Sequence, residues 1–423
     1  MTTIRAFYRR LIPKMRRGTA SGSLLLSILL ILPPIAIPLA RAQTFTVLHE
    51  FAGGRDGAWP MDVIRGANGN TYGVTQLGGS FDYGTVFEIN AAGNKKTILH
   101  SFLGSDGLYP VGGLMQDAAG NLYGTTSDGG AAEGGGCEHG CGVVFKIDTA
   151  GTQTLLYVFA SGKANGSQPD AALIQDPGGN LYGTTAYGGS PSCFVGLGCG
   201  VIFELNTSGE QSVLYTFLDK SDGKSPQGVI RDGLGNLYTV TYDGGTQSDG
   251  AVLKLDKTGK LTVLYSFTGG SDSGDPVGPL VIDKSGNLYG STYGVGIALT
   301  GFGLVYKLDT AGNFTILYTF NGTTDGQYPG SLVMDAAGNL YGVALGGGTG
   351  TGCYYGGCGT VFKVDTAGNF SVLHSFTLAD GQLPNHLIID RAGNLYGTTL
   401  GGGKVGSGCS YYKGCGTVFE LTP

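Results

Sequence analysis

Charged residues are scarce in this sequence, at 13 % of 423 positions, and the chain holds a single tryptophan. It has 80 glycines but only 15 prolines and no repeating G-X-Y period, which excludes collagen and favours many tight turns between short strands. Helix-forming residues at amphipathic spacing are missing beyond the first forty or so positions, which argues against a helical bundle. The composition therefore predicts an all-β protein.

A long apolar stretch near the N-terminus, residues 23–37, follows a basic start and precedes the small-residue pattern Ala40-Arg41-Ala42. Prolines break it below the roughly 18–20 apolar residues that span a bilayer, although a membrane anchor is the alternative interpretation. We predict that residues 1–42 are an export signal cleaved before Gln43. The mature chain, residues 43–423, would be secreted to the extracellular space or the periplasm, without stable membrane insertion.

Basic groups are few in this predicted mature chain. Seven of the 25 Lys and Arg residues, and none of the 31 Asp and Glu residues, fall in residues 1–42, which leaves a balance of −13. A surface of that sign repels phosphate backbones and anionic lipids. We therefore expect no nucleic-acid partner and no binding to a membrane surface.

What the sequence does contain is a phrase, Gly-Asn-Leu-Tyr-Gly with close variants, that returns at steps of 51 to 59 residues. A fixed phrase at such a period indicates a repeat architecture. The asparagines of the seven copies are Asn70, Asn121, Asn180, Asn236, Asn287, Asn339 and Asn394.

Each repeat holds four short segments rich in β-branched and aromatic residues, such as residues 110–117, 121–126, 359–364 and 372–376. Short links such as Asp117 to Asn121 place Gly and Asn where a hairpin turn needs positive φ. Seven repeats of four antiparallel strands predict a seven-bladed β-propeller.

The two chain ends predict how the ring closes. Residues 44–51 form a fourth segment with no repeat before them, and the last repeat stops after its third segment, residues 416–421. The N-terminal strand can therefore complete blade 7, which removes the open edges that invite aggregation. An open solenoid would instead need atypical capping repeats, and none is visible.

The phrases Gly-Asn-Leu-Tyr-Gly-Thr-Thr and Gly-Thr-Val-Phe-Lys-Leu resemble the GloVer tandem repeats of secreted bacterial proteins, over roughly residues 44–423. The resemblance implies no established activity. Some members end in a sorting anchor; this chain stops after its last strand, so we expect a released protein.

Features shared by every blade are expected to serve the fold. We place two repeated sets of aromatic positions in the core. The first set is Tyr72, Tyr123, Tyr182, Tyr238, Tyr289, Tyr341 and Tyr396, and the second is Phe87, Phe145, Phe203, Leu253, Tyr306, Phe362 and Phe419.

The two connections of variable length, from fourth to first strand and from second to third, fall on the same face of a four-stranded meander. Loops are where function gathers, so a ligand should meet that face or the channel mouth.

All eight cysteines lie in the second-to-third connections. Four local disulfides are expected in an exported chain, with a metal site as the rival interpretation of the Cys-Glu-His-Gly-Cys loop. The expected pairs are Cys137 with Cys141, Cys193 with Cys199, Cys353 with Cys358, and Cys409 with Cys415.

The other variable connection often carries Asp-Gly followed by an aromatic residue or a proline. It is either a turn motif or a ring of carboxylates and aromatics suited to a sugar or a peptide, because aromatic faces stack on sugar C–H surfaces. The candidate ligand-binding residues are Trp59, Tyr109, Tyr328, Asp56, Asp106, Asp325 and Asp380.

Two polar residues, Asp62 and His386, occupy an inner-strand position that is small in the other blades, and the ring makes their blades neighbours. Such a pair is either an acid–base couple or a structural bond at the closure seam.

The sequence favours a secreted binding protein for a glycan, peptide or protein partner, acting as a monomer without metal or cofactor. The alternatives are an enzyme such as a lactonase, lyase or glycan-cleaving propeller, and a structural role. The inner strands carry no glutamate and few converging acids, which argues against catalysis.

Overall fold

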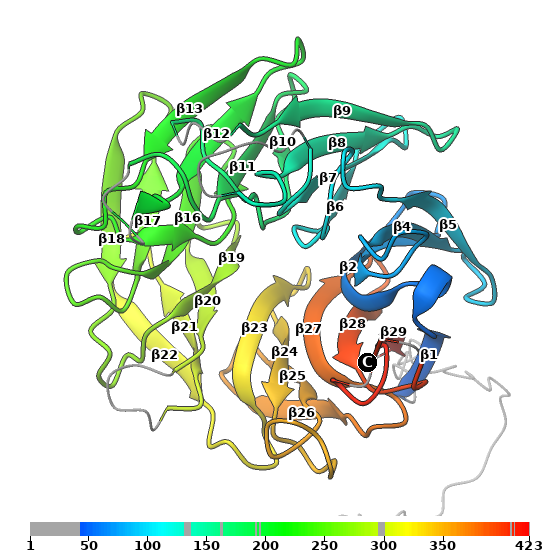
Figure 1. Ribbon diagram of the computed structural model, residues 1–423. Helices are drawn as coiled ribbons and strands as arrows, with labels where there is room; N and C mark the ends of the chain where they lie inside the picture. The colour runs from blue at the N-terminus through cyan, green and yellow to red at the C-terminus, as the bar shows by residue number, and fades with distance from the viewer. Residues whose placement is uncertain are drawn as a thin grey trace, which may run out of the picture. The chain divides into compact units, whose positions relative to one another are not determined.

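The computed structural model describes residues 43–130, 137–160, 164–190, 193, 196–294, 301–406, 408–409 and 411–422. They form seven antiparallel sheets arranged as blades around a central axis (Figure 1). This confirms the predicted all-β fold and the seven-bladed β-propeller. The predicted export signal lies outside the described residues. Within the described part, no helix is both long and apolar enough to cross a membrane.

The first and second strands of each blade lie nearest the axis. The inner strands are β2 (Ala58–Arg65), β6 (Leu114–Gln116), β10 (Ile174–Gln175), β14 (Lys224–Pro226) with β15 (Ile230–Arg231), β19 (Pro276–Ile282), β23 (Gln327–Met334) and β27 (Gln382–Ile389). The second strands are β3 (Thr71–Leu77), β7 (Leu122–Thr126), β11 (Leu181–Thr185), β16 (Leu237–Asp243), β20 (Leu288–Thr292), β24 (Leu340–Gly346) and β28 (Leu395–Gly401).

The third and fourth strands complete each blade toward the outside. The third strands are β4 (Thr85–Ile89), β8 (Val143–Ile147), β12 (Val201–Leu205), β17 (Ala251–Leu255), β21 (Leu304–Leu308), β25 (Thr360–Val364) and β29 (Thr417–Thr422). The outer strands are β5 (Lys96–Ser101), β9 (Gln153–Val158), β13 (Gln211–Thr216), β18 (Leu261–Ser266), β22 (Phe314–Thr319), β26 (Phe370–Ser375) and β1 (Thr44–Glu50).

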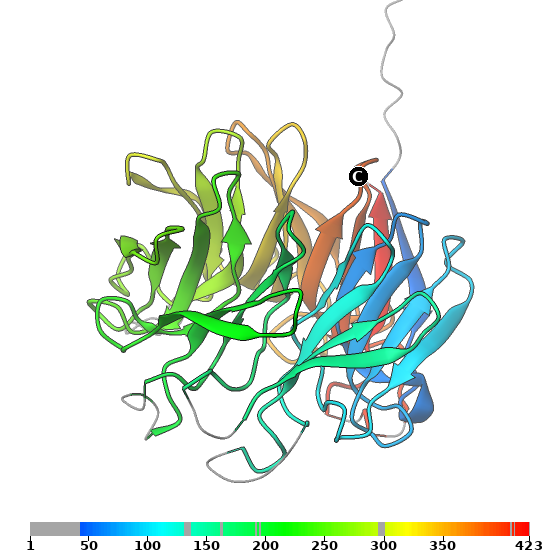
Figure 2. The same cartoon turned by 90° about the horizontal axis from the view of Figure 1, so that it is seen from above.

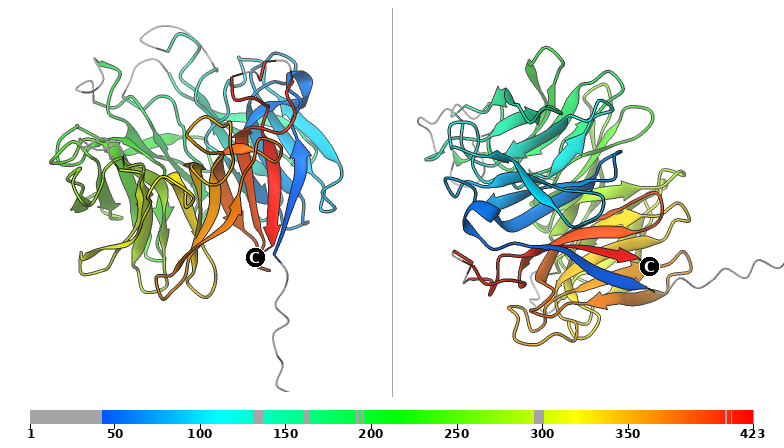
Figure 3. Two further views of the ribbon diagram at one scale, coloured as in Figure 1. Left: turned by 90° about the horizontal axis from the view of Figure 1, so that it is seen from below. Right: turned by 90° about the vertical axis from the view of Figure 1, so that its right-hand side faces the viewer.

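The ring closes as predicted. Blade 7 has the strand order β27-β28-β29-β1, and β1 pairs antiparallel with β29 from Thr44 opposite Thr422 to Glu50 opposite Thr417. Figure 3 shows β1 and β29 side by side in both of its views. One short 3-10 helix, η1 (Gly54–Asp56), follows β1 and leads into blade 1.

Strand reversal divides the propeller into two faces (Figure 2). We call the face with the short first-to-second and third-to-fourth links the tight-turn face, and the opposite one the loop face. Thr44 and Thr422, which are paired, lie on the tight-turn face. All connections of variable length therefore meet on the loop face.

Close packing within a blade explains the repeated Tyr-Gly pair. Gly73 lies opposite Phe87 in the β3–β4 register, and a Cβ on Gly73 would stand 2.5 Å from Phe87 Cζ. Only glycine leaves room for that ring. Phe87 and its counterparts are fully buried, which confirms the second predicted core set.

An aspartate side chain stabilises the link between the first and second strands. The Asp117 carboxylate accepts the backbone N–H of Ala119 at 2.9 Å and of Asn121 at 2.8 Å. Gly120 adopts φ 91°, but Asn121 does not take the predicted positive φ; its side chain donates to Asp117 Oδ2 at 2.7 Å. The same aspartate returns as Asp176, Asp232, Asp283, Asp335 and Asp390.

The second-strand tyrosines all belong to or pack against the core, as predicted, but they differ in how deeply they are buried. Three of them, Tyr72, Tyr341 and Tyr396, are buried, but the other four are half-buried. Their hydroxyls reach the turn aspartates, as Tyr123 does with Asp117 at 3.0 Å. These four rings still pack against the buried clusters of the blades, so they lie at the edge of the core in which the sequence placed them.

Neighbouring blades are joined by one contact that repeats at every junction. The glycine before each third strand packs against a proline on the loop-face side of the next inner strand. Beside it, the residue before that proline donates its backbone N–H to the preceding blade, as Tyr109 does to the Tyr83 carbonyl at 3.1 Å. The glycine–proline pairs are Gly84–Pro110, Gly142–Pro169, Gly200–Pro226, Gly250–Pro276, Gly303–Pro329, Gly359–Pro384 and Gly416–Pro60.

Replacing a junction glycine should loosen the ring. In Gly84→Ala the new Cβ would stand 2.5 Å from both Pro110 Cδ and the Thr75 carbonyl oxygen. We expect a loss in the free energy of unfolding clearly above the about 1–2 kcal/mol that left-handed φ alone costs an L-residue. Gly151→Ala is the matched control, because Gly151 has φ 84° with open space around it. Equal losses for the two variants in urea denaturation would contradict the junction role.

Candidate functional site

Seven residues around the mouth of the channel share an unusual backbone conformation. Each stands directly before the junction proline and has φ between 52° and 58°, a region that bulky residues seldom occupy. Strain of this kind gathers at functional sites when the surrounding structure enforces it. This pre-proline ring consists of Trp59, Tyr109, Gln168, Ser225, Asp275, Tyr328 and Leu383.

Two members of the pre-proline ring belong to a continuous chain of aromatic contacts on the loop face. Tyr328 meets Tyr293 with ring centroids 6.3 Å apart and Tyr355 at 5.5 Å, and Trp59 meets Tyr412 at 5.1 Å. The remaining steps span 4.7–6.3 Å. We call these eight rings the aromatic arc: Tyr242, Tyr293, Tyr328, Tyr355, Tyr354, Tyr411, Tyr412 and Trp59.

The arc spans blades 4 to 7 and continues into blade 1. Its most exposed members, Tyr354 at 54 % and Tyr411 at 60 %, come from neighbouring loops and share a hydrogen bond of 3.1 Å between their hydroxyls. Trp59 is half-buried, and its buried indole N–H has no acceptor among the described residues. The arc thus presents the rings and hydroxyls of its exposed tyrosines to solvent, while Trp59 is partly packed into the protein.

Two disulfide loops of parallel construction carry the centre of the arc. Cys353–Cys358 closes around Tyr354 and Tyr355, and Cys409–Cys415 closes around Tyr411 and Tyr412. The side chains of Gln327 and Gln382 donate to the carbonyls of Tyr355 and Tyr412 respectively. Each tyrosine pair is therefore fixed by a covalent ring on one side and by an inner strand on the other.

The other two predicted disulfides are formed as well, in blades 2 and 3. Cys137 is bonded to Cys141, and Cys193 is bonded to Cys199, so both thiols of the Cys-Glu-His-Gly-Cys loop are used in a covalent bond. The carbonyl of Cys141 accepts the backbone N–H of Gln168 at 2.8 Å, and the carbonyl of Cys199 accepts that of Ser225 at 3.0 Å. Besides closing their loops, Cys141 and Cys199 thus hold two members of the pre-proline ring.

The arc ends in blades 4 and 5 beside a group of carboxylates. Burial, assisted by the charges of Asp249 and Asp243, raises the pKa of Asp275 to about 6. Burial and then the charges of Asp275 and Asp243 raise the pKa of Tyr242. Lys224 partly compensates, since its Nζ lies 3.3 Å from Asp243 Oδ2.

The channel holds the other candidate site. His386 Nδ1 contacts Asp62 Oδ1, so the structure brings this predicted pair together across the junction of blades 7 and 1. Both line a cavity of about 220 Å³ to which all seven blades contribute. Asp170 lines it too, and burial raises the pKa of this carboxyl to about 7. Across the described ranges, no three His, Cys, Asp or Glu residues are grouped to hold a metal ion.

A family model described as the Gloeobacter/Verrucomicrobia repeat matches residues 37–195, 130–302 and 270–423. The chain belongs to this family. The resemblance noted from the repeated phrases is thereby confirmed. No curated protein matches this chain.

Solved structures share the fold of this family member at low identity. Virginiamycin B lyase from Staphylococcus aureus is 12 % identical with a TM-score of 0.60, covering 90 % of this chain and 100 % of its own. The extracellular domain of a candidate hybrid two-component system from B. thetaiotaomicron is also 12 % identical, with a TM-score of 0.57, covering 90 % of this chain and 42 % of its own. At such identity the likeness shows the propeller fold alone.

The predicted aspartates of the loop face are engaged within the protein. Asp106 accepts His100 Nε2 at 3.0 Å and the Leu103 N–H at 2.7 Å, and these bonds, against the opposing effect of burial, hold its pKa below the usual value. Asp56, Asp325 and Asp380 bond in the same way to His49, Tyr318 and His374 of the outer strands. They brace the connection into the next blade, and a role in ligand binding stays a prediction.

The structure separates the predicted aromatic residues. Trp59 and Tyr328 lie in the arc, whereas Tyr109 occupies the same backbone position in blade 2 without a ring contact to the arc among the described residues. The sequence reasoning missed the Tyr-Tyr pairs inside two cysteine loops, although their repetition at 354–355 and 411–412 was a visible signal.

Removing the acid at the end of the arc should change how stability depends on pH. The folded pKa of Asp275 lies above the usual 3.8, so its stabilising contribution is complete below about pH 4 and is lost as the pH rises through about 6. Asp275→Asn lacks this loss, so we expect a higher Tm than wild type at pH 7 and little difference at pH 4. A variant that follows wild type at both pH values would contradict the assignment.

Proposed function

We propose that this family member is an exported carbohydrate-binding protein and that the aromatic arc is its binding surface. The observation that carries the proposal is the unbroken contact of eight rings across the loop face, with Tyr354, Tyr355 and Tyr411 exposed. Aromatic faces stack on the C–H faces of sugar rings, and phenol hydroxyls both donate and accept hydrogen bonds. An arc of this extent suits several sugar units of a chain better than one monosaccharide.

The charge of the protein narrows the class of carbohydrate. The mature chain is acidic, and the arc ends beside Asp243 and Asp275. A sulfated or uronic-acid polymer would be repelled by these carboxylates, whereas neutral hydroxyls can donate to them. The proposed ligand is therefore a neutral polysaccharide. Four disulfides and the predicted export signal support a location outside the cytoplasm.

The channel supports a ligand-binding role less well. Its cavity of about 220 Å³ is smaller than the roughly 300–1,000 Å³ that is usual for small-molecule sites. The pair of Asp62 and His386 also joins two blades at the closure of the ring. We therefore favour binding on the loop face over catalysis in the channel.

Removing arc rings should weaken binding on a glycan array and in titrations with the polysaccharide it identifies. We expect Trp59→Ala to weaken binding by about 3–10-fold, the effect of one aromatic contact, and a double variant, Tyr354→Ala with Tyr411→Ala, to weaken it further. Tyr109→Ala is the matched control, because it changes the same pre-proline position outside the arc. The proposal would be contradicted if both arc variants bound with full affinity, or if the wild type bound no neutral glycan.

Opening the Cys353–Cys358 loop should separate binding from folding. On the chain-entropy estimate so short a loop stabilises the protein by only about 2 kcal/mol. We expect the double variant Cys353→Ser with Cys358→Ser to keep the fold but bind glycan more weakly, because Tyr354 and Tyr355 lose their support.

The loop of blade 2 supplies the matched control for this disulfide. The double variant Cys137→Ser with Cys141→Ser opens a loop that carries no ring of the arc. It should be destabilised to a similar degree with unchanged affinity. Equal affinity in the two double variants would argue against the arc.

A further inference from the structure

On the tight-turn face the second-strand tyrosines have charged neighbours, and one junction between blades differs from the others in these neighbours. In every blade the second-strand tyrosine lies directly opposite a charged third-strand residue. In four blades that residue is a lysine, with Nζ 5.4–5.8 Å from the centroid of the tyrosine ring. In the other three it is a glutamate: Glu88, Glu204 and Glu420.

Two of the three glutamate junctions receive an arginine from the next inner strand. Between blades 7 and 1, the Arg65 guanidinium lies 4.3 Å from the centroid of the Tyr396 ring, and the Tyr396 hydroxyl donates to Glu420 Oε1 at 2.8 Å. Between blades 3 and 4, burial and then the charge of Glu204 raise the pKa of Tyr182, while the charge of Arg231 lowers it. A glutamate, a tyrosine and a guanidinium therefore form the complete set at these junctions.

At the third glutamate junction, between blades 1 and 2, no described residue supplies this cation, and Glu88 Oε1 accepts the Asn70 side-chain amide instead. Glu88 stands opposite Tyr72, but the inner-strand position that holds Arg65 and Arg231 elsewhere is Gln116 here. Gln116 is neutral and is turned toward the links: its Oε1 accepts the Ala67 N–H and its Nε2 donates to the Gly120 carbonyl, both at 3.3 Å.

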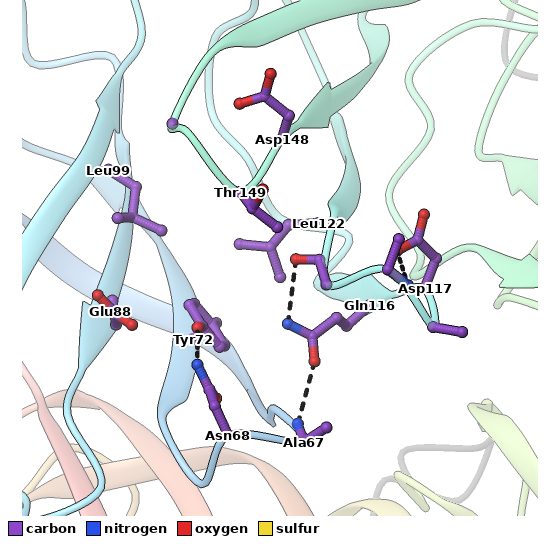
Figure 4. Close-up of a pocket in the computed structure, with 14 residues that line it drawn as sticks. Ala67, Asn68, Tyr72, Glu88, Leu99, Gln116, Asp117, Leu122, Asp148 and Thr149 are labelled. Atoms are coloured by element: carbon purple, nitrogen blue, oxygen red, sulfur yellow. Dashed lines mark hydrogen bonds between the residues drawn. The ribbon is translucent and has the colours of Figure 1, made fainter.

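A cavity of about 520 Å³ lies at this junction. Figure 4 shows Glu88, Tyr72 and Leu99 on its blade 1 side, with Leu122 and Asp148 on its blade 2 side. The leucines and the tyrosine ring offer an apolar wall, and three lining carboxylates, Glu88, Asp117 and Asp148, supply negative charge. A side chain with an apolar stem and a planar cationic head matches that combination.

We propose that the pocket between blades 1 and 2 binds an arginine side chain of a peptide or protein partner. Its guanidinium would lie over the Tyr72 ring as that of Arg65 lies over the Tyr396 ring, with Glu88 opposite Tyr72 as Glu420 is opposite Tyr396. Guanidinium is the better cation because it stacks on aromatic rings and donates a planar fork of hydrogen bonds to a carboxylate. The pocket is on the tight-turn face, so it is independent of the glycan surface.

The test is a titration of the purified protein with N-acetyl-L-arginine amide, followed by NMR chemical shifts. The neutral isostere N-acetyl-L-citrulline amide is the matched probe, and we expect it to bind at least about tenfold more weakly, the effect of losing a charge-assisted hydrogen bond. Glu88→Gln should weaken arginine binding by a similar factor, whereas Glu420→Gln at the junction already filled by Arg65 should leave it unchanged.

A second variant tests the internal comparison directly. Gln116→Arg restores the arginine found at the other two glutamate junctions, so it should abolish binding of the probe and raise Tm. Gln116→Ala, which enlarges the pocket without supplying a cation, should keep the binding. The proposal is wrong if arginine and citrulline probes bind alike, if neither saturates, or if Gln116→Arg binds the arginine probe as wild type does.

Discussion

The contact between a glycine and the proline of the next blade is the constraint on which the rest of the ring depends. A side chain on the glycine would collide with the proline ring, so neighbouring blades can approach closely only where it has none. The hydrogen bond beside it fixes the residue before the proline in a left-handed conformation at all seven junctions. Because the last junction joins Gly416 to Pro60, the same contact also closes the circle.

This constraint leaves the identity of the pre-proline residue free. The backbone is held by neighbours, so Trp59, Ser225 and Leu383 occupy equivalent positions with different chemistry. The second-to-third connections beside them vary in length, and four of them are stiffened by disulfides. The loop face can therefore be specialised blade by blade without changing the junctions, and the aromatic arc is such a specialisation of one side of the ring.

The tight-turn face varies less between blades than the loop face does, because its links are short and nearly identical. A turn aspartate and the tyrosine that donates to it recur from blade to blade, and each such tyrosine lies opposite a charged third-strand residue. Departures from the pattern are therefore informative. Blade 1 has Gly66 where other blades have the aspartate, and Gln116 stands beside Glu88 where an arginine is found at two other junctions. Glu88 and Gln116 line one pocket, and Gly66 directly precedes Ala67, which lines it too.

The sequence by itself determined the all-β class, seven blades, closure by residues 44–51 and four local disulfides, because these follow from periodicity and from spacing along the chain. It also singled out Trp59 and Tyr328. Only the tertiary structure decided which side chains meet across blades: that Asp56 and Asp106 brace their own loops, that tyrosines from four blades and Trp59 join in one arc, and that Glu88 lacks the arginine its counterparts have. Contacts between residues far apart in sequence depend on the angle and spacing of the blades, which packing sets and a linear pattern does not encode.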